Sequence, residues 1–553
     1  METPSFKMPR RARHSVSYLL SALLIVSALF SSSIQTMPAR AAAQEFETQG
    51  TAGDLDPGFG NGGKIITDFS GNDDTASAVA IEPDGKIVVG GTSTAQGGNS
   101  DFTLCRYNVD GGLDPSFGSN GRVITDFFHD KDSLRGIAIQ PDGKIVAAGS
   151  ALEPGVGTEF AIARYHFDGS LDQSFGSGGK TATRFPEDAE AAAVALTAAG
   201  KIVAVGTASI RIKPRFALAR YNSDGTLDTS FGTSGIIVNT LHTSRAQAVA
   251  LQPDNKIVIA GEDKDAQNFV LFRYNSNGSA DTSFGIAGQV ISGSFLISRA
   301  HAVALQPDGK IVVAGFGQTS IFKDLFGVSR HNTNGSFDGT FGSLGGSLRT
   351  SISSRDDRAT ALTIDSNGKI IVAGFVGAPS DVFQGFADFG VVRYKRQGKV
   401  DNSFGTSGKV VTDFFGGSDG ANAIALQADG KIVLAGTAQS ATNDFAVARY
   451  LVEDFALRFE PPIVTASRGT TVSVDLLIDH VGGFEGSVTV TPPDLSAIGV
   501  TLKPVDQIIT THSKKTLNLK IKPTAQVGVH LLTFKGQDEQ GRSRTATVSL
   551  TIQ

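Results

Sequence analysis

The sequence contains almost no cysteine and no tryptophan. Cys105 is the single cysteine among 553 residues. An intrachain disulfide is therefore excluded, and the fold must be stabilised by packing rather than by cross-links. We expect Cys105 to occupy an apolar core position rather than to act as a reactive thiol, because apolar residues replace it in most of the repeats described below. They are Ala163, Ala219, Phe272, Val392 and Ala448.

Long runs of one charge are also missing. Charged residues make up 19% of the chain, and the formal net charge is −5. Binding to nucleic acid phosphates needs a basic surface, so this composition argues against nucleic acid as a partner. Glycine, in contrast, is abundant, with 65 residues, and hydrophobic residues make up 40%. Such a composition is typical of a folded, turn-rich protein rather than a disordered one.

Only one long apolar run is present, and it lies near the N-terminus. It extends from Tyr18 to Phe30, follows the basic residues Lys7 to Arg13, and precedes the small residues of "ARAAAQ". This order predicts a signal peptide over residues 1–43. A run of about 13 residues is short for a bilayer span of roughly 20, so a retained membrane anchor is the less favoured alternative. We expect a secreted, periplasmic or cell-surface protein with no membrane span in its mature chain.

Three sequence markers recur seven times in a fixed order. The phenylalanine of "FG" recurs at Phe59, Phe117, Phe175, Phe231, Phe284, Phe341 and Phe404. The lysine of "DGKIV" recurs at Lys86, Lys144, Lys201, Lys256, Lys310, Lys369 and Lys431. The arginine of "RY" recurs at Arg106, Arg164, Arg220, Arg273, Arg330, Arg393 and Arg449. Such regular repetition of three markers along the chain predicts a repeat architecture.

Each repeat contains four short segments that are typical of strands. In the first repeat they are "SAVAIEP", "KIVVGGT", "DFTLCRYN" and "GRVITDF", separated by Gly, Asp and Asn. No helical periodicity occurs outside the predicted signal peptide. Four strands per repeat match one propeller blade. We therefore predict an all-β protein with a seven-bladed β-propeller over residues 53–451.

The phase of the repeats predicts how the ring closes. The array opens with "GKIITDF" (Gly63–Phe69), the fourth strand of a repeat, and ends with "DFAVARY" (Asp444–Tyr450), the third strand. The first strand should therefore complete the seventh blade, which removes the open sheet edges.

The turn residue of "PDGK" is glycine in six copies and Asn255 in the fourth. Both residue types tolerate a positive φ, which indicates a backbone constraint at this turn.

The motifs "LDxSFGxxGK", "PDGKIVVAG" and "DFxxxRYNxDG" resemble the delta-60 repeat, a bacterial β-propeller repeat found in tandem in exported proteins. The resemblance covers about Leu55 to Tyr450. It implies the propeller fold and no particular activity. The third copy departs with "TAAGK" and the sixth with "DSNGK", but both keep the turn glycine.

The pattern changes after Tyr450. Residues 455–553 contain about seven alternating segments with Pro and Gly breaks, among them "TTVSVDLLIDHV" and "RTATVSLTI". This spacing predicts an immunoglobulin-like β-sandwich. The Cys–Trp–Cys core of antibody domains is missing. "GGFEGSVTVTPP" resembles a segment of bacterial Ig-like modules appended to secreted proteins.

Seven aspartates match the seven arginines one for one, at Asp56, Asp114, Asp172, Asp228, Asp281, Asp338 and Asp401. An Arg–carboxylate pair would pin the turn between the third and fourth strands. Seven equal copies favour a structural role, because catalysis needs groups with unlike roles in one place.

The segment "NVDGGLD" (Asn108–Asp114) spaces oxygens as a calcium loop does. The sixth copy, "KRQGKVD", lacks the first ligand, so an ordinary turn is favoured.

Function should depend on the loops that differ between repeats, since variable loops on a rigid scaffold are the usual place for binding. Several charged residues just before the predicted innermost strands should ring the mouth of the central channel. They are Asp74, Asp132, Asp188, Arg245, Arg299, Asp357, Arg358 and Asp419. We hypothesise that this mouth binds a cation such as Ca²⁺, or a polar ligand such as a glycan. A merely solvated charged rim is the alternative.

The sequence contains no GxSxG, HExxH, CxxC or P-loop motif, and it predicts no catalytic residue. The favoured interpretation is a secreted, non-enzymatic binding or scaffold protein that presents its variable propeller face to a polar ligand, a glycan or an extracellular protein. The alternative is an extracellular propeller enzyme, a hydrolase or lyase, acting on polysaccharide. Apart from Ca²⁺, no cofactor is expected.

Overall fold

The computed structural model describes residues 51–69, 71–240, 243–265, 268–291, 299–318, 323–378, 387–452, 454–481, 484, 486–503, 508–510, 514–538 and 543–553. The predicted signal peptide, residues 1–43, lies outside the described residues. Among those that are described, no helix is long and apolar enough to cross a bilayer.

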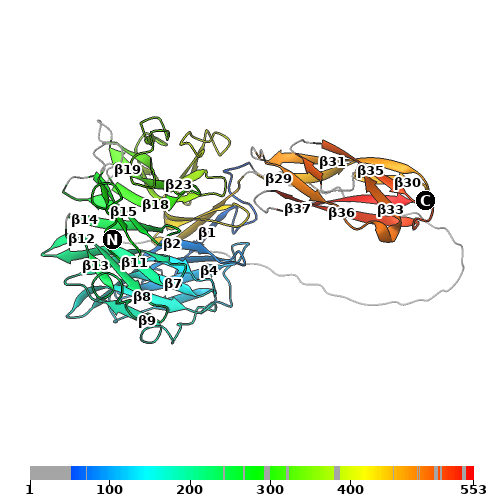
Figure 1. The fold of residues 1–553 in the computed structure, drawn as a ribbon. Coiled ribbons are helices and arrows are strands. Elements are labelled where there is room, and N and C mark those ends of the chain that lie inside the picture. The colour runs from blue at the N-terminus through cyan, green and yellow to red at the C-terminus, as the bar shows by residue number, and fades with distance from the viewer. Residues whose placement is uncertain are drawn as a thin grey trace, which may run out of the picture. The chain divides into compact units, whose positions relative to one another are not determined.

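Seven four-stranded antiparallel sheets, the blades, follow one another along the chain (Figure 1). Blade 1 contains β2 (Asp74–Ile81), β3 (Ile87–Thr94), β4 (Ser100–Tyr107) and β5 (Arg122–Thr125). Blade 2 contains β6 (Asp132–Ile139), β7 (Ile145–Glu153), β8 (Gly157–Tyr165) and β9 (Lys180–Thr183). Blade 3 contains β10 (Ala189–Leu196), β11 (Ile202–Ile210), β12 (Lys213–Tyr221) and β13 (Ile236–Val238).

The later blades repeat the same order. Blade 4 contains β14 (Ser244–Leu251), β15 (Ile257–Asp263), β16 (Asn268–Tyr274) and β17 (Gln289–Ile291). Blade 5 contains β18 (Arg299–Leu305), β19 (Ile311–Gln318), β20 (Asp324–His331) and β21 (Ser347–Thr350). Blade 6 contains β22 (Asp356–Ile364), β23 (Ile370–Ala378), β24 (Asp388–Tyr394) and β25 (Lys409–Thr412). Blade 7 contains β26 (Gly420–Leu426), β27 (Ile432–Gln439), β28 (Asn443–Tyr450) and β1 (Lys64–Thr67).

Blade 7 is built from both ends of the array. Strand β1 pairs with β28 in antiparallel register from Lys64↔Ala448 to Thr67↔Phe445. The first strand of each blade contacts the first strand of the next, and β26 of blade 7 contacts β2 of blade 1. Figure 1 shows the blue strands β1 and β2 beside the yellow strands of blade 7. The ring therefore closes through the N-terminal strand, which confirms the prediction from the repeat phase.

The core of the ring lies between neighbouring blades. Phe117 of blade 1, for example, belongs to one apolar cluster with Ile145 of blade 2, and both are fully buried. The tyrosine of "RY" adds a polar link, since the Tyr107 hydroxyl lies 2.7 Å from Thr67 Oγ1 of the preceding blade. The same link joins Tyr165 to Thr125, Tyr221 to Thr183, Tyr394 to Thr350 and Tyr450 to Thr412. Buried hydroxyl groups are thus satisfied across the blade interfaces.

The antiparallel order gives each blade two unlike ends. One end carries the "DGK" hairpin and the turn before the fourth strand, which are nearly the same in every repeat; we call it the turn face. The opposite end carries the loops between the second and third strands and the connections to the next blade; we call it the variable face. Gly85 and Asn255, at equivalent turn positions, have φ of 86° and 62°. The predicted positive φ at this turn is confirmed.

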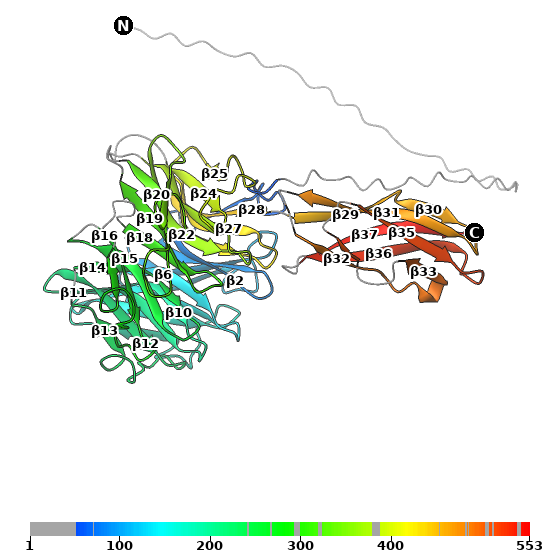
Figure 2. The ribbon, with the colours of Figure 1, turned by 45° about the horizontal axis from the view of Figure 1, so that its top comes forward.

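The C-terminal part of the chain forms two sheets that pack face to face (Figure 2). One sheet contains β29 (Asp454–Glu460), β31 (Thr471–Val481), β35 (Lys514–Ile521) and β33 (Val500–Lys503). The other contains β30 (Ile463–Ala466), β37 (Ser543–Ile552), β36 (Gly528–Asp538), β32 (Val488–Thr491) and β34 (Ile508–Thr510). A short 3₁₀ helix covers Ser496–Ile498. Leu476 and Leu517 of the first sheet share one apolar core with Phe534 and Val548 of the second.

Candidate functional site

Each blade contains one cluster of a partly exposed lysine, a buried aspartate and a buried arginine, which we call the ion triplet. In blade 1, Asp114 Oδ2 lies 2.8 Å from Arg106 Nη2 and 2.9 Å from Lys86 Nζ. The equivalent groups in the other blades are Lys144–Asp172–Arg164, Lys201–Asp228–Arg220, Lys256–Asp281–Arg273, Lys310–Asp338–Arg330, Lys369–Asp401–Arg393 and Lys431–Asp56–Arg449. The predicted Arg–Asp pairing is confirmed in all seven blades.

The arginine of each triplet also makes further contacts. Its guanidinium lies over the phenylalanine of "FG", with 4.7 Å between Arg106 Cζ and the Phe117 ring centre. In blades 1 to 5 and 7 it also reaches the next blade, as Arg330 Nη1 does when it donates to the carbonyl oxygen of Arg396 over 2.6 Å. The triplet therefore ties a turn to its own blade and to the neighbouring one. Seven such clusters form a structural framework.

Electrostatics within the triplets favour the charged carboxylate. Burial alone would raise the pKa of Asp114, but hydrogen bonds from Lys86 and Ser116 and the charge of Arg106 hold that pKa well below its usual range. The pKa of Asp172, Asp228, Asp281 and Asp338 is lowered for the same reasons. These carboxylates therefore stay ionised and paired with the lysine and arginine side chains, and they are not poised for proton transfer.

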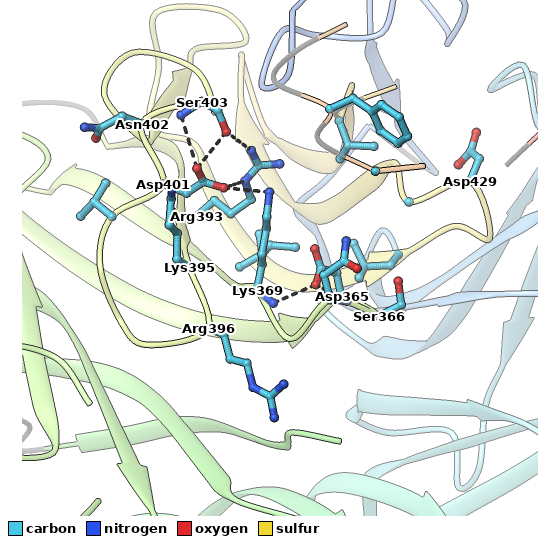
Figure 3. A pocket seen from close by; sticks show the side chains of 18 of the residues that line it. Asp365, Ser366, Lys369, Arg393, Lys395, Arg396, Asp401, Asn402, Ser403 and Asp429 are labelled. Carbon is cyan, nitrogen blue, oxygen red and sulfur yellow. Dashed lines mark hydrogen bonds and ion pairs between the residues drawn. The ribbon is translucent and has the colours of Figure 1, made fainter. Parts of the chain in front are cut away.

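The pocket of Figure 3 lies on the turn face and contains one of these triplets. Asp401 lies between Arg393 and Lys369, at 3.0 Å from each, and accepts a hydrogen bond from Ser403 Oγ. Asp365, Arg396 and Asp429 also line this pocket. Arg396 is ion-paired with Asp308 of blade 5 over 3.0 Å. The chemistry of the pocket is thus largely that of the repeated framework.

The predicted channel-mouth aspartates fall into two groups. Asp74, Asp132, Asp357 and Asp419 occupy one equivalent position at the start of the innermost strands, and each is at most 1% exposed. Each accepts a hydrogen bond from the backbone N–H five residues earlier, as Asp132 does from Phe127 over 2.7 Å. Asp188 precedes this position, is exposed, and accepts a hydrogen bond from Thr158 N. The four buried carboxylates therefore do not belong to a solvated rim.

The three predicted arginines occupy the next position on three consecutive innermost strands. Arg245 and Arg299 are exposed, and Arg358 is 40% exposed. Arg299 Cζ and Arg358 Cζ lie 5.7 Å and 5.5 Å from the centre of the same Phe316 ring. Arg299 pairs with Glu262 and Arg358 with Asp324. The structure thus brings Arg299 and Arg358 together at an aromatic ring on the variable face.

Three of the four buried aspartates belong to repeated clusters of three carboxylates. The clusters are Asp101–Asp126–Asp132, Asp68–Asp74–Asp444 and Asp388–Asp413–Asp419, and in each the three oxygens lie within 4.8 Å of one another. Burial, followed by the nearby charges of Asp126 and Asp101, raises the pKa of Asp132 to about 7. Burial likewise raises the pKa of Asp74 and Asp419 to about 6.

Two features of these sites were missed in the reasoning from sequence, although the sequence contains a signal for each. The lysine of the ion triplet recurs in every "DGK" motif, so its strict repetition could have assigned it to the framework. Asp68, Asp126 and Asp413 belong to the motif "TDF", which occurs in three repeats. The same three repeats carry "DF" at the start of the third strand. This co-occurrence could have identified the acid clusters.

Other predicted features were also placed by the structure. Cys105 is fully buried in β4, and burial raises the pKa of its thiol to about 12. The segment "NVDGGLD" forms a turn in which Asp110 Oδ1 accepts from Gly112 N, in agreement with the turn interpretation. The variable loops at 93–101 and 151–159 are described, whereas those at 317–326 and 376–388 lie partly outside the described residues.

Comparison with known proteins supports the propeller and assigns no activity. Seven segments match the family model "Domain of unknown function (DUF5122) beta-propeller", at residues 82–117, 140–175, 200–231, 252–284, 306–341, 366–404 and 427–452. They fall one in each blade and support a propeller repeat protein. No curated protein sequence matches the chain.

Solved structures give only distant likenesses. A hypothetical protein from Leishmania major is 10% identical, with 50% of this chain and 86% of that chain covered and a TM-score of 0.23. A tail fiber of Staphylococcus aureus phage P68 is 7% identical, with 64% and 73% covered and a TM-score of 0.24. The tetra-tandem repeat of a large adhesion protein is 12% identical, with 86% and 98% covered and a TM-score of 0.15. At such scores these likenesses carry no argument about function.

Proposed function

We propose that this protein is an exported, non-enzymatic binding scaffold whose propeller presents its variable face to a polar partner. The turn face is occupied by the same ion triplets in every blade, so it offers seven equal structural groups. The variable face differs from blade to blade, in loop length and in charge. A site that recognises one partner needs such differences, and a rigid ring holds them in place.

The observation that carries the proposal is the arginine pair at Phe316. Arg299 and Arg358 have side chains 54% and 40% exposed while both guanidinium groups lie over one ring. Arg245 occupies the equivalent exposed position on the adjacent innermost strand. Guanidinium groups bind carboxylates in a bidentate manner, and the Phe316 ring, which is 8% exposed, holds the two groups side by side. An acidic glycan therefore fits this part of the variable face best.

Export and the C-terminal sandwich complete the proposal. The order of charges and apolar residues in 1–43 supports cleavage and release to the periplasm, the cell surface or the medium. We assign the C-terminal sandwich to the immunoglobulin-like class, as a spacer or docking domain, and the propeller repeats to the delta-60 type. An enzyme acting on polysaccharide is the alternative. It would need catalytic groups with unlike roles in one place, whereas the repeated acid clusters supply three groups of one kind.

Binding to defined polysaccharides tests the proposal. The purified chain is applied to immobilised uronate-containing and neutral polysaccharides, together with the double variant Arg299→Ala/Arg358→Ala. The control is Arg396→Ala, which removes an exposed, ion-paired arginine from the turn face. We expect retention on the acidic polysaccharide, at least tenfold weaker in the double variant and unchanged in the control. Equal retention of all three proteins, or none, would contradict this site. Release of new reducing or unsaturated ends would favour the enzyme.

A further inference from the structure

We propose that the three acid clusters each bind one Ca²⁺ ion and that the bound ions clamp neighbouring blades on either side of the ring closure. This inference is independent of the arginine pair and of the partner proposed above. It rests on the positions of the carboxylates, on one oxygen that lacks a hydrogen-bond partner, and on what replaces the acids in other blades.

Each cluster joins two blades at what we call a junction, the connection from the fourth strand of one blade to the first strand of the next. At the junction of blades 1 and 2, Asp101 begins the third strand of blade 1 together with Ser100, and Asp126 follows its fourth strand. Asp132 begins the first strand of blade 2. The clusters at the junctions of blades 7 and 1 and of blades 6 and 7 use the same three positions.

The geometry suits a calcium ion. Ca²⁺ takes 6–8 oxygen ligands at about 2.3–2.6 Å, so its ligand oxygens lie up to roughly twice that distance apart. Within each cluster the three carboxylate oxygens lie within 4.8 Å of one another. Three carboxylates can supply three to six ligands if some bind in a bidentate manner, and carbonyl groups or water complete the shell.

One buried oxygen of the first cluster has no partner. Asp132 is 1% exposed, and its Oδ2 accepts a hydrogen bond from Phe127 N. Its Oδ1 is buried and accepts no hydrogen bond from any residue between 71 and 240 or elsewhere in the described chain. His129 pairs with Asp126, and Lys180 Nζ donates to the Asp126 carbonyl oxygen rather than to a carboxylate of the cluster. A buried carboxylate oxygen without a donor costs free energy, which a bound cation would offset.

At the junction of blades 5 and 6, the ammonium group of Lys323 lies where the three junctions with acid clusters are proposed to hold Ca²⁺. Asp357 is kept there, whereas Leu325 and Ser351 replace the other two acids. Lys323 Nζ donates to Ser351 Oγ and to the Ser353 carbonyl oxygen, each over 2.6 Å. The same ammonium lies 4.0 Å from Asp357 Oδ2. Where two carboxylates are lost, a lysine therefore supplies positive charge beside the third.

The other described junctions follow the same rule. At the junction of blades 2 and 3, Glu159 is kept, Arg184 replaces the second acid, and Ala189 replaces the third. At the junction of blades 3 and 4 the three positions are Arg215, Thr240 and Ser244. At the three aligned positions of these described junctions, acids thus occur as a set of three, singly or not at all. A shared ligand explains why they occur together, because two carboxylates without a cation would only repel each other.

The locations of the clusters indicate what the ions do. They lie at three consecutive junctions, 6/7, 7/1 and 1/2, and the first two flank the blade that β1 completes. An ion at each junction would hold the third and fourth strands of one blade against the first strand of the next. A calcium ion that binds the folded ring and not the unfolded chain stabilises the ring by mass action. Calcium would therefore be a structural ligand of the closure.

Calcium binding by the full chain tests the proposal. After removal of metal with a chelator, equilibrium dialysis or calorimetry with CaCl₂ should give about three ions per chain, and the melting temperature should rise with CaCl₂. Asp101→Asn should reduce the stoichiometry to two, and Asp101→Asn/Asp388→Asn to one. No described hydrogen bond uses the side chain of Asp101 or of Asp388, so both substitutions should preserve the fold, as circular dichroism would check.

The matched control is Glu159→Gln, which neutralises the equivalent position at a junction that lacks the other two acids. This variant should still bind three ions. Absence of calcium uptake at millimolar CaCl₂ together with an unchanged melting temperature would overturn the proposal. The same stoichiometry in wild type, Asp101→Asn and Asp101→Asn/Asp388→Asn would overturn it equally, since the ions would then be bound elsewhere.

Discussion

Arg449 and Asp56 lie 393 residues apart in the sequence and form one buried ion pair, with 2.9 Å between Arg449 Nη2 and Asp56 Oδ2. In blade 1 the corresponding pair, Arg106 and Asp114, is separated by 8 residues. The ion triplet of blade 7 is therefore completed by the segment that precedes β1. The ring closes through side chains of the repeated framework as well as through strand pairing.

Asp56→Asn is expected to lower the free energy of unfolding by about 3–5 kcal/mol, because it leaves the buried Arg449 without its carboxylate partner. Chemical denaturation, followed by circular dichroism, measures the effect. The control is Asp84→Asn, which removes a 44% exposed carboxylate 3.6 Å from Lys86 and should change stability by less than about 0.5 kcal/mol. Equal unfolding midpoints for the two variants would show that the closing pair does not stabilise the ring.

A second prediction concerns pH. Folding raises the pKa of Asp132 from about 3.9 to about 7, mainly through burial. The protonated carboxyl is thus favoured in the folded state, so the stability that this group contributes is present at low pH and is lost as pH rises to about 7. Asp132→Asn keeps the shape without the charge. In metal-free buffer its stability relative to wild type should rise with pH, by up to about 1.4 kcal/mol per pH unit between pH 4 and 7.

The pH dependence of stability must be compared between wild type and Asp132→Asn, because two histidines make the stability of both proteins depend on pH in the opposite direction. Burial lowers the pKa of His301 and His331 to about 4, so their contribution to stability is lost as pH falls below about 6.5. Both histidines are present in wild type and variant, and their effect cancels in the difference. A difference that is constant from pH 4 to 7 would mean that Asp132 is not protonated more readily on folding.

Cys105 should be unreactive in the native protein. Its thiol is fully buried, and burial raises its pKa to about 12, so both access and thiolate are lacking. A thiol-specific chromogenic reagent should label less than about 5% of the native chain in an hour and one thiol per chain in denaturant. Rapid labelling without denaturant would contradict the placement of Cys105 in β4.

Much of the ring could be predicted because its constraints are local and repeated seven times. Asn255 indicated a positive φ because it replaces a glycine that every other repeat keeps. The Arg–Asp pairs followed from one-for-one counting, and the ring closure followed from the strand with which the array begins. Each of these inferences used a comparison between copies within the chain, because a residue type that recurs at one position in every copy reflects a constraint that all the blades share.

The candidate sites could be predicted only in part, because their residues come from different blades. Asp74, Asp132 and Asp419 were identified as charged residues before the innermost strands, but their burial depends on how the next blade packs over them. Their partners Asp101 and Asp126 lie on two further strands, and periodicity does not show that all three meet. The contact of Arg299 and Arg358 with one phenylalanine ring likewise depends on the twist of neighbouring blades.

Cross-linking of β1 to β28 tests most directly whether the repeats form a closed ring. In a Cys105→Ala background, cysteines replace the register partners Ile66 and Ala446, or Ile65 and Val447 in a second variant. Mild oxidation should produce an intrachain disulfide in at least one of the two pairs, seen as a mobility shift that a reductant reverses, while a mismatched pair, Ile66 with Val205 of blade 3, stays reduced. Intermolecular cross-links only, or equal cross-linking of the mismatched pair, would contradict the closed ring.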